Sequence, residues 1–240
     1  MVMNFELTNI EINLTELCDR TCFFCPRSIG YPNKNFNLSL DDAIILRERL
    51  DEFNFKGWLS LCGQGEPTLN KNFTKLIDIF AKNKKYKIRL TTNGYKFENH
   101  DKNILNKLDR LVISVYENEK YEFFKKQVSK LKIDKIELRK QYENVEKFNN
   151  CGGYFNSLTV NRPCKFPFFK MYIDYNLDIR LCCNDWKEKK IMGSLQKNSI
   201  YDIWNNAMFN EYRTHLSKGY RNKLNPCSKC DAYGLGDIYA

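Results

Sequence analysis

The sequence predicts an α/β fold, a partial (open) TIM barrel of about five to six βα units followed by a small cysteine-rich C-terminal domain that contains a β-hairpin. Two observations predict this fold. Along the first 150 residues, short apolar runs alternate with amphipathic segments, which is the pattern of βαβ units in a parallel sheet. A closed eight-unit barrel needs at least about 200 residues, so this part of the chain is too short to close one.

The first predicted strand covers residues 9–14, where polar and apolar side chains alternate as in a half-buried strand. Ser39 then precedes a run with an acidic first turn and helical apolar spacing, so a helix is expected over residues 40–53. The same alternation continues through the first part of the chain. It predicts strands over residues 58–62, 86–92, 111–115 and 133–138, and helices over residues 70–83, 99–108 and 118–131.

The character of the sequence changes after residue 150, where an irregular stretch without helical periodicity begins. We therefore expect two domains, residues 1–150 as the partial barrel and residues 151–240 as the cysteine-rich domain. In the second domain, residues 171–181 predict a hairpin and residues 200–209 a helix. No Pro- or Ser-rich linker separates the two domains, so we expect them to pack against each other.

Composition limits where the protein works and what it contacts. Hydrophobic residues make up 42% of the chain and aromatic residues 14%, which is typical of a globular protein. No apolar run approaches the ~18–20 residues that a membrane span needs, and no signal-peptide pattern is visible at the start. We expect a cytoplasmic protein without a membrane partner, in which ten cysteines favour metal binding or catalysis over disulfides.

The net charge of +10 permits an anionic substrate or an acidic partner protein. The lysines are dispersed in short runs at residues 82–87, 125–126 and 187–190, which is typical of solvated faces. No recognisable nucleic-acid-binding motif is present, so we do not expect nucleic acid as a partner.

Three cysteines fall within eight residues directly after the first predicted strand. Cys18, Cys22 and Cys25 are spaced C-x₃-C-x₂-C, and the next cysteine, Cys62, is far away in the sequence. Thiolates are the usual ligands of iron–sulfur clusters. A cubane cluster and a structural zinc site both normally take four protein ligands. Three thiolates would leave one iron of a cluster open to another ligand.

Polar motifs follow the next predicted strands, at the edge where parallel barrels carry their functional residues. Gly63-Gln64-Gly65-Glu66-Pro67 follows the second strand, Thr92-Asn93 follows the third, and Ser114 lies near the end of the fourth. Taken alone, the first motif is an ordinary turn. Thr92, Asn93 and Ser114 suit turn or strand-end roles equally well.

The cysteine spacing, with Phe24 directly before the last cysteine, resembles the signature of the radical S-adenosylmethionine (radical SAM) enzymes. The segment Gly65-Glu66-Pro67 resembles the GEP segment with which these enzymes meet the amino group of SAM. The resemblance covers about residues 9–140. It implies a [4Fe–4S] cluster on Cys18, Cys22 and Cys25, and a SAM site that includes Phe24, Gly65, Glu66, Pro67, Thr92, Asn93 and Ser114.

The resemblance also implies the reaction. In the family, an electron from the reduced cluster splits SAM into methionine and a 5′-deoxyadenosyl radical, which abstracts hydrogen from the substrate. The cofactor supplies that chemistry, and the protein supplies position and exclusion of water. The electron is expected from a flavodoxin- or ferredoxin-type donor.

A second set of cysteines lies in the C-terminal domain: Cys164, Cys182, Cys183, Cys227 and Cys230. Cys227 and Cys230 form a C-x₂-C pair, and Cys164 with one of the adjacent pair completes four thiolates. Four thiolates suit a [4Fe–4S] cluster or a structural zinc ion. The layout resembles the auxiliary-cluster domain of SPASM and twitch radical SAM enzymes, in the shorter twitch form with one cluster. We choose Cys182 as the ligand, because neighbours on a strand point to opposite sides.

Cys62, Cys151 and Cys183 remain, and a buried free cysteine is most often a small hydrophobic residue. Cys62 at the end of a strand and Cys151 beside two glycines are also candidates to donate a hydrogen atom to a substrate radical. A base is needed to take the proton of an alcohol. The candidates near predicted strand ends are Arg139, Lys140 and Asp185.

The predicted function is that of a radical SAM oxidoreductase which dehydrogenates a small polar substrate, as twitch-type dehydrogenases do, with the auxiliary cluster accepting an electron. The alternatives within the family are an epimerase, which would use Cys62 or Cys151, and a peptide-modifying maturase. Many such maturases carry an additional N-terminal leader-binding domain, whereas here the barrel begins almost at once. A non-enzymatic zinc protein would leave the unpaired third cysteine of the first set unexplained. Neither charge nor motif identifies the substrate, a small molecule or a peptide.

Overall fold

The computed structural model describes residues 5–141, 149–156, 160–187, 190–232 and 234. The strands are β1 (Asn9–Ile12), β2 (Trp58–Leu61), β3 (Lys87–Thr92), β4 (Arg110–Val115), β5 (Lys135–Lys140), β6 (Lys170–Ile173), β7 (Asp178–Arg180) and β8 (Ile191–Ser194). The helices are α1 (Leu40–Glu52), α2 (Phe73–Ala81), α3 (Lys102–Leu105), α4 (Tyr121–Val128), α5 (Phe166–Phe169), α6 (Ile200–Trp204) and α7 (Ala207–Ser217).

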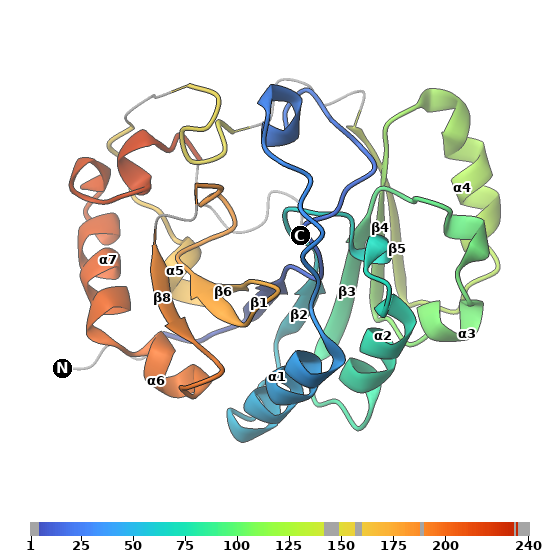
Figure 1. The fold of residues 1–240 in the computed structure, drawn as a ribbon, viewed down its shortest axis with the longest axis horizontal. Coiled ribbons are helices and arrows are strands. Elements are labelled where there is room, and N and C mark those ends of the chain that lie inside the picture. Colours follow the sequence, from blue (N-terminus) through green and yellow to red (C-terminus); the bar gives the residue numbers. More distant parts are fainter. Residues whose placement is uncertain (1–4, 142–148, 157–159, 188–189, 233, 235–240) are drawn as a thin grey trace.

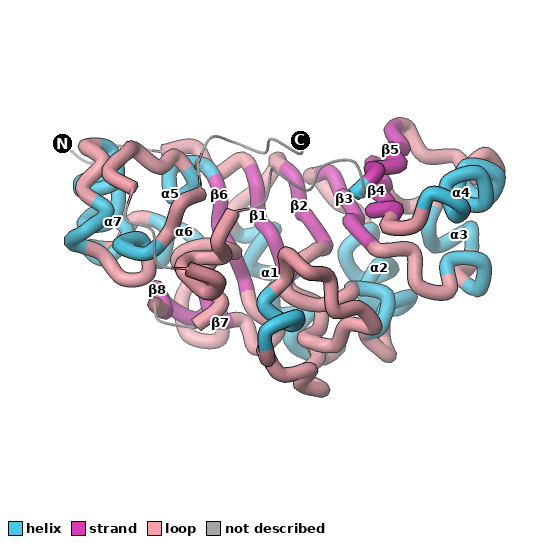
Figure 2. The backbone as a smooth tube through the Cα atoms, turned by 90° about the horizontal axis from the view of Figure 1, so that it is seen from above, coloured by secondary structure: helices cyan, strands magenta, loops and turns pink. Residues whose placement is uncertain are grey.

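One eight-stranded sheet organises the described residues, in the order β5-β4-β3-β2-β1-β6-β7-β8. Neighbouring strands from β5 to β6 are parallel, and β7 and β8 are added antiparallel. The strands stand in a row across the molecule, and α1 to α4 lie on the outer side of the row (Figures 1 and 2). The sheet does not close, so the structure confirms the predicted open α/β barrel.

The alternation of side chains along the strands separates the two faces of the sheet. Ile10 and Ile12 of β1 belong to the apolar core, together with Leu59 of β2. Their neighbour Glu11 points to the other face, where it forms an ion pair with Lys170 of β6. On the same pattern, Arg110 of β4 pairs with Glu137 of β5 at 2.7 Å. These charged side chains of neighbouring strands are therefore paired with each other.

The predicted hairpin is present, since β6 and β7 pair antiparallel with Tyr172 opposite Arg180. However, β6 also pairs in parallel with β1, with Met171 beside Ile10. The hairpin therefore extends the barrel sheet instead of forming a sheet of its own. Met171 and Ile173 are completely buried in the core that the barrel strands share, which explains why the sheet continues here.

The helix predicted over residues 200–209 is split into α6 and α7. The side chain of Asn206 accepts a hydrogen bond from the backbone N–H of Phe209 at 2.8 Å and so begins a new helix. Among the described residues, no helix has both the length and the apolar character needed to cross a membrane.

Candidate active site

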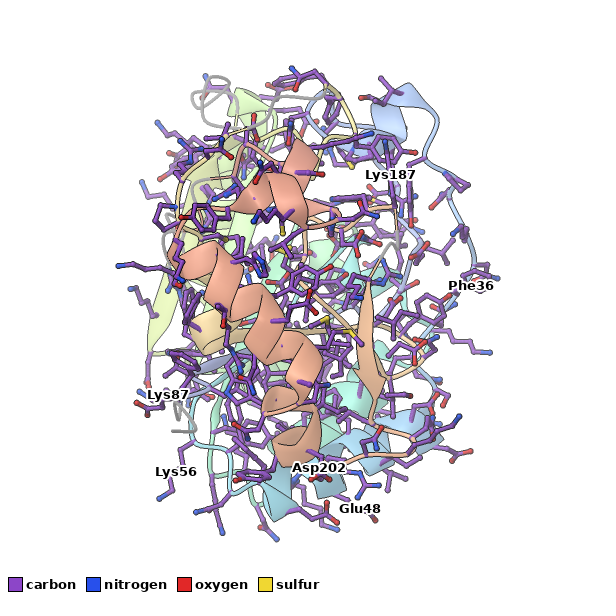
Figure 3. All side chains as sticks on the ribbon, turned by 90° about the vertical axis from the view of Figure 1, so that its left-hand side faces the viewer. Phe36, Glu48, Lys56, Lys87, Lys187 and Asp202 are labelled. Carbon is purple, nitrogen blue, oxygen red and sulfur yellow. The ribbon has the colours of Figure 1, made fainter. Side chains whose placement is uncertain are left out.

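A cavity of about 230 Å³ lies at the carboxyl ends of β1 to β4. In Figure 1 this is the upper edge of the sheet, next to the blue loop that follows β1. Figure 3 shows Lys187 at this end of the molecule, and Lys56 and Lys87 at the opposite end. The cavity brings together most of the predicted site residues. They are Cys18, Cys22, Phe24, Cys25, Cys62, Gly65, Glu66, Thr92, Asn93, Ser114 and Cys151.

The loop that carries the first three cysteines is held by two polar side chains, the exposed Asn33 and the buried Arg27. Asn33 accepts a hydrogen bond from the backbone N–H of Cys18 at 2.9 Å and donates one to its carbonyl at 3.1 Å. Arg27 donates to the carbonyl of Gln64 at 3.1 Å and to the Asn33 side chain at 3.1 Å. The cysteine loop is thereby tied to the loop after β2.

Burial makes two thiols of this loop, those of Cys18 and Cys25, poor acids on their own. It raises the pKa of Cys18 to about 12, against a hydrogen bond from the backbone of Arg20. Burial also raises the pKa of Cys25 above its usual range. Such thiols lose their protons when a metal supplies the opposing positive charge. The three cysteines Cys18, Cys22 and Cys25 on one cavity wall are a donor set that suits an iron–sulfur cluster with an open iron.

Gly63 and Gly65 are glycines because the loop after β2 lies directly against the chain after β1. A Cβ at Gly63 would stand 2.5 Å from Oδ1 of Asn13, and one at Gly65 would stand 2.0 Å from the carbonyl oxygen of Thr15. In the structure the space beside them is filled by the protein itself.

The Glu66 side chain is buried beside the cavity and receives several hydrogen bonds. Oε1 accepts from the hydroxyls of Thr68 at 2.8 Å and Thr92 at 2.5 Å, and Oε2 accepts from the backbone N–H of Asn93 at 2.7 Å. Burial raises the pKa of Glu66, and these hydrogen bonds oppose the rise. The end of β3 therefore fixes the position of the carboxylate, and Oε2 keeps the capacity to accept a further bond.

The cysteines of the second set are buried or partly buried and lie close to one another. Burial raises the pKa of Cys182 well above its usual range, and the thiols of Cys183, Cys227, Cys230 and Cys164 raise it further. Cys227 has Cys164 and Cys230 as its own neighbours. By contrast, Cys183 has the ammonium of Lys170 at 3.9 Å.

Among the described residues, no three His, Cys, Asp or Glu side chains are close enough to hold a single metal ion. The four thiolates of a [4Fe–4S] cluster each bind a different iron and so lie farther apart than ligands around one ion.

Two family models match the chain, and the first covers more than half of it. Residues 12–159 match the Radical SAM superfamily. The chain belongs to the radical SAM superfamily. Residues 164–231 match SPASM, an iron-sulfur cluster-binding domain. The protein is a radical SAM enzyme whose two domains imply SAM and two iron–sulfur clusters, as the sequence predicted, and the non-enzymatic zinc protein is set aside.

Known relatives agree with this family over nearly the whole chain. The chain is similar to an S-adenosyl-L-methionine-dependent 2-deoxy-scyllo-inosamine dehydrogenase of Niallia circulans. The two sequences are 24% identical over 233 residues, and the aligned region covers 92% of each protein. The fold is similar to that of BtrN in complex with AdoMet and 2-DOIA, with a TM-score of 0.81, 22% identity and coverage of 97% of this chain and 96% of that one. It is also similar to native anSMEcpe with bound AdoMet, with a TM-score of 0.62, 14% identity and coverage of 92% and 88%.

Of the three predicted catalytic residues of this radical SAM enzyme, two line the cavity and one does not. Cys62 and Cys151 line the cavity, and the Cys151 thiol lies 3.8 Å from the carbonyl oxygen of Phe24. Arg139 lies outside the lining, on β5, where it pairs with Glu137 at 3.1 Å. Pro67 also lies outside the lining and begins the turn after Glu66.

Seven cavity residues were not predicted as site residues from the sequence: Arg20, Pro26, Gly63, Gln64, Thr91, Tyr116 and Trp186. The ring of Tyr116 stacks on Phe24 with centroids 6.2 Å apart, and the Arg20 guanidinium lies 4.3 Å from the centre of the Tyr116 ring. Tyr116 comes two residues after Ser114, so the two-residue period of a strand would have placed both on the same side.

Proposed function

We propose that this radical SAM enzyme is a dehydrogenase that oxidises an alcohol group of a small, polar, aminocyclitol-type molecule. The observation that carries the proposal is the relationship to the 2-deoxy-scyllo-inosamine dehydrogenase, which extends over 92% of both chains and includes both domains. The cavity supports it, because its lining joins the cysteine loop of the first domain to Cys151 and Trp186 of the second. A cytoplasmic location and an anionic group on the substrate stay predictions.

We propose the following ligands within the two domains, residues 1–150 and residues 151–240. The first cluster is held by Cys18, Cys22 and Cys25, and the auxiliary cluster by Cys164, Cys182, Cys227 and Cys230. The SAM site includes Phe24, Gly65, Glu66, Pro67, Thr92, Asn93 and Ser114. The shared cavity supports the ligands of the first cluster and the SAM site, apart from Pro67. The closeness of the four thiols to one another supports the ligands of the auxiliary cluster.

Oxidation of a secondary alcohol to a ketone removes one hydrogen atom from carbon, one proton from oxygen and one further electron. When bound, SAM at the first cluster supplies the 5′-deoxyadenosyl radical that takes the hydrogen atom, and the auxiliary cluster supplies an acceptor for the electron. The chain must supply the base. Arg139, Lys140 and Asp185 lie outside the cavity lining, so the base remains a prediction to be tested by substitution.

The experiment is an anaerobic assay of the reconstituted enzyme with SAM, dithionite and 2-deoxy-scyllo-inosamine. We expect 5′-deoxyadenosine and the corresponding ketone in equal amounts. With deuterium on the carbon that bears the oxidised hydroxyl, the label should move into 5′-deoxyadenosine. A reduced flavodoxin or ferredoxin in place of dithionite tests the expected donor. Formation of 5′-deoxyadenosine with no ketone would reject the proposal.

An epimerase is the second candidate, and one observation favours it. Cys62 and Cys151 both line the cavity, where either thiol could return a hydrogen atom to the substrate. The assay in D₂O separates the two functions. Solvent deuterium on an inverted carbon would indicate an epimerase, whereas a dehydrogenase yields the ketone.

A further inference from the structure

The Gln64 side chain has a buried donor without a partner in the part of the chain that the structure describes. Gln64 lines the active-site cavity, yet only 4% of the residue is exposed. Its Nε2 atom is shielded from solvent and makes no hydrogen bond there. Buried amide groups in native proteins are almost always hydrogen-bonded. An unpaired donor beside a cavity therefore indicates a ligand with an acceptor atom.

Neighbouring residues determine which way the Gln64 amide faces. Oε1 accepts a hydrogen bond from Nη1 of Arg180 at 3.2 Å. Arginine can only donate, so the oxygen must face Arg180 and the NH₂ group must face away from it. Arg180 is itself held by an ion pair with Asp174, and Glu16 lies 3.8 Å from it.

The backbone of Gln64 is equally fixed. Its N–H donates to Oδ1 of Asn13 at 3.2 Å, and its carbonyl accepts from Arg27 at 3.1 Å. Since the flanking glycines pack against the chain after β1, the loop has little room to shift. The amide is thus held in place before any ligand arrives.

The side chains on either side of Gly65 point to different parts of the molecule. Glu66 bonds to Thr92 and Asn93 at the end of β3, where the proposed SAM residues lie. Gln64 bonds to Arg180 of β7, in the C-terminal domain. We infer that the Gln64 amide donates a hydrogen bond to a hydroxyl or carbonyl oxygen of the substrate and so positions it. This inference rests on the proposed function, because it takes the substrate to be an oxygen-bearing small molecule.

The first test uses the unaltered chain and needs no activity. A crystal structure of the reconstituted enzyme with SAM alone should show Oε1 on Arg180 and no SAM or protein atom bonded to Nε2. Water bonded to Nε2 in the space beside SAM would also fit. A SAM oxygen or a protein acceptor within hydrogen-bond distance of Nε2 would overturn the inference, whatever the substrate is.

The second test measures binding of 2-deoxy-scyllo-inosamine to the SAM-loaded enzyme. Gln64→Met keeps the length of the side chain but loses the donor, and Gln196→Met, at an exposed glutamine, is the matched control. We expect Kd for the alcohol to rise about tenfold in Gln64→Met only, while both variants keep the iron content and the SAM Kd of the wild type. An unchanged alcohol Kd, or a change confined to SAM, would contradict the inference. If the wild type does not bind this alcohol, the proposed substrate class fails, and the SAM-bound structure still decides the role of Gln64.

Discussion

At the scale of single residues, the sequence revealed the residues whose function requires one particular amino acid. Only cysteine gives the thiolates of Cys18, Cys22 and Cys25, and their spacing is visible in the chain. Gln64 has no such signal. Its orientation depends on Arg180, which lies 116 residues further along, so no local pattern could predict it.

The choice between two adjacent cysteines gives a prediction at this scale. The reconstituted wild type should hold about eight iron atoms per chain, four in each cluster. Cys182→Ser should lose about half of this iron, because Cys182 lies among the other three thiols of its set. Cys183→Ser, the matched control, should keep all of it. An iron assay reads both variants, and the opposite result would assign the ligand to Cys183.

His100 gives a pH prediction. The ring of His100 packs on Phe73 and Phe97, and burial lowers its pKa. The unfolded chain then binds more protons than the folded one as pH falls below about 6.5, so folding stability should fall with it. His100→Gln should lose less stability than the wild type between pH 7 and pH 5.5. Urea midpoints at the two pH values measure this, and equal losses would contradict it.

At the scale of elements, the strands of the first domain and the helices α1, α2 and α4 follow the sequence closely, because each has a periodic apolar face. The helix predicted over residues 99–108 is present only as the short α3, Lys102–Leu105. The helix predicted over residues 200–209 failed for a local reason. The apolar spacing runs across Asn206, but the Asn206 side chain caps a new helix at that point. A capping side chain favours the start of a new helix, whereas the apolar spacing favours one continuous helix. At Asn206 the capping interaction determines the structure.

The cap of α1 tests how much such a residue contributes. Ser39 accepts a hydrogen bond from the backbone N–H of Asp42 at 3.0 Å and donates to its carboxylate at 2.7 Å. Ser39→Ala should lower the free energy of unfolding by about 1 kcal/mol, or Tm by about 2–4 °C. Ser129→Ala, an exposed serine after α4, should change stability by less than about 0.5 kcal/mol. Equal melting temperatures for the two variants would mean that the cap is not stabilising.

At the scale of the whole molecule, the sequence predicted an open barrel and a packed second domain but not the strand that joins them. The residues Lys170–Ile173 have the pattern of a strand, but nothing in their sequence indicates that the strand pairs with β1. Strand pairing across 161 residues, as between Asn9 of β1 and Lys170 of β6, is decided by which buried faces meet. Local periodicity carries no information about that choice.

The shared sheet predicts cooperative unfolding. Because β1 pairs with both β2 and β6, the two domains cannot separate without breaking the middle of the sheet. Calorimetry of the metal-free chain should show a single transition, with equal calorimetric and van't Hoff enthalpies. Two resolved transitions would show that the domains unfold independently.

The packing of Gly63 and Gly65 against the chain after β1 has a consequence for binding. A loop that is already held in place by protein atoms loses little conformational entropy when SAM arrives. Preorganisation of this kind increases affinity without adding a contact. A larger residue at Gly65 would therefore weaken SAM binding by loosening the loop, even though its side chain need never touch the cofactor.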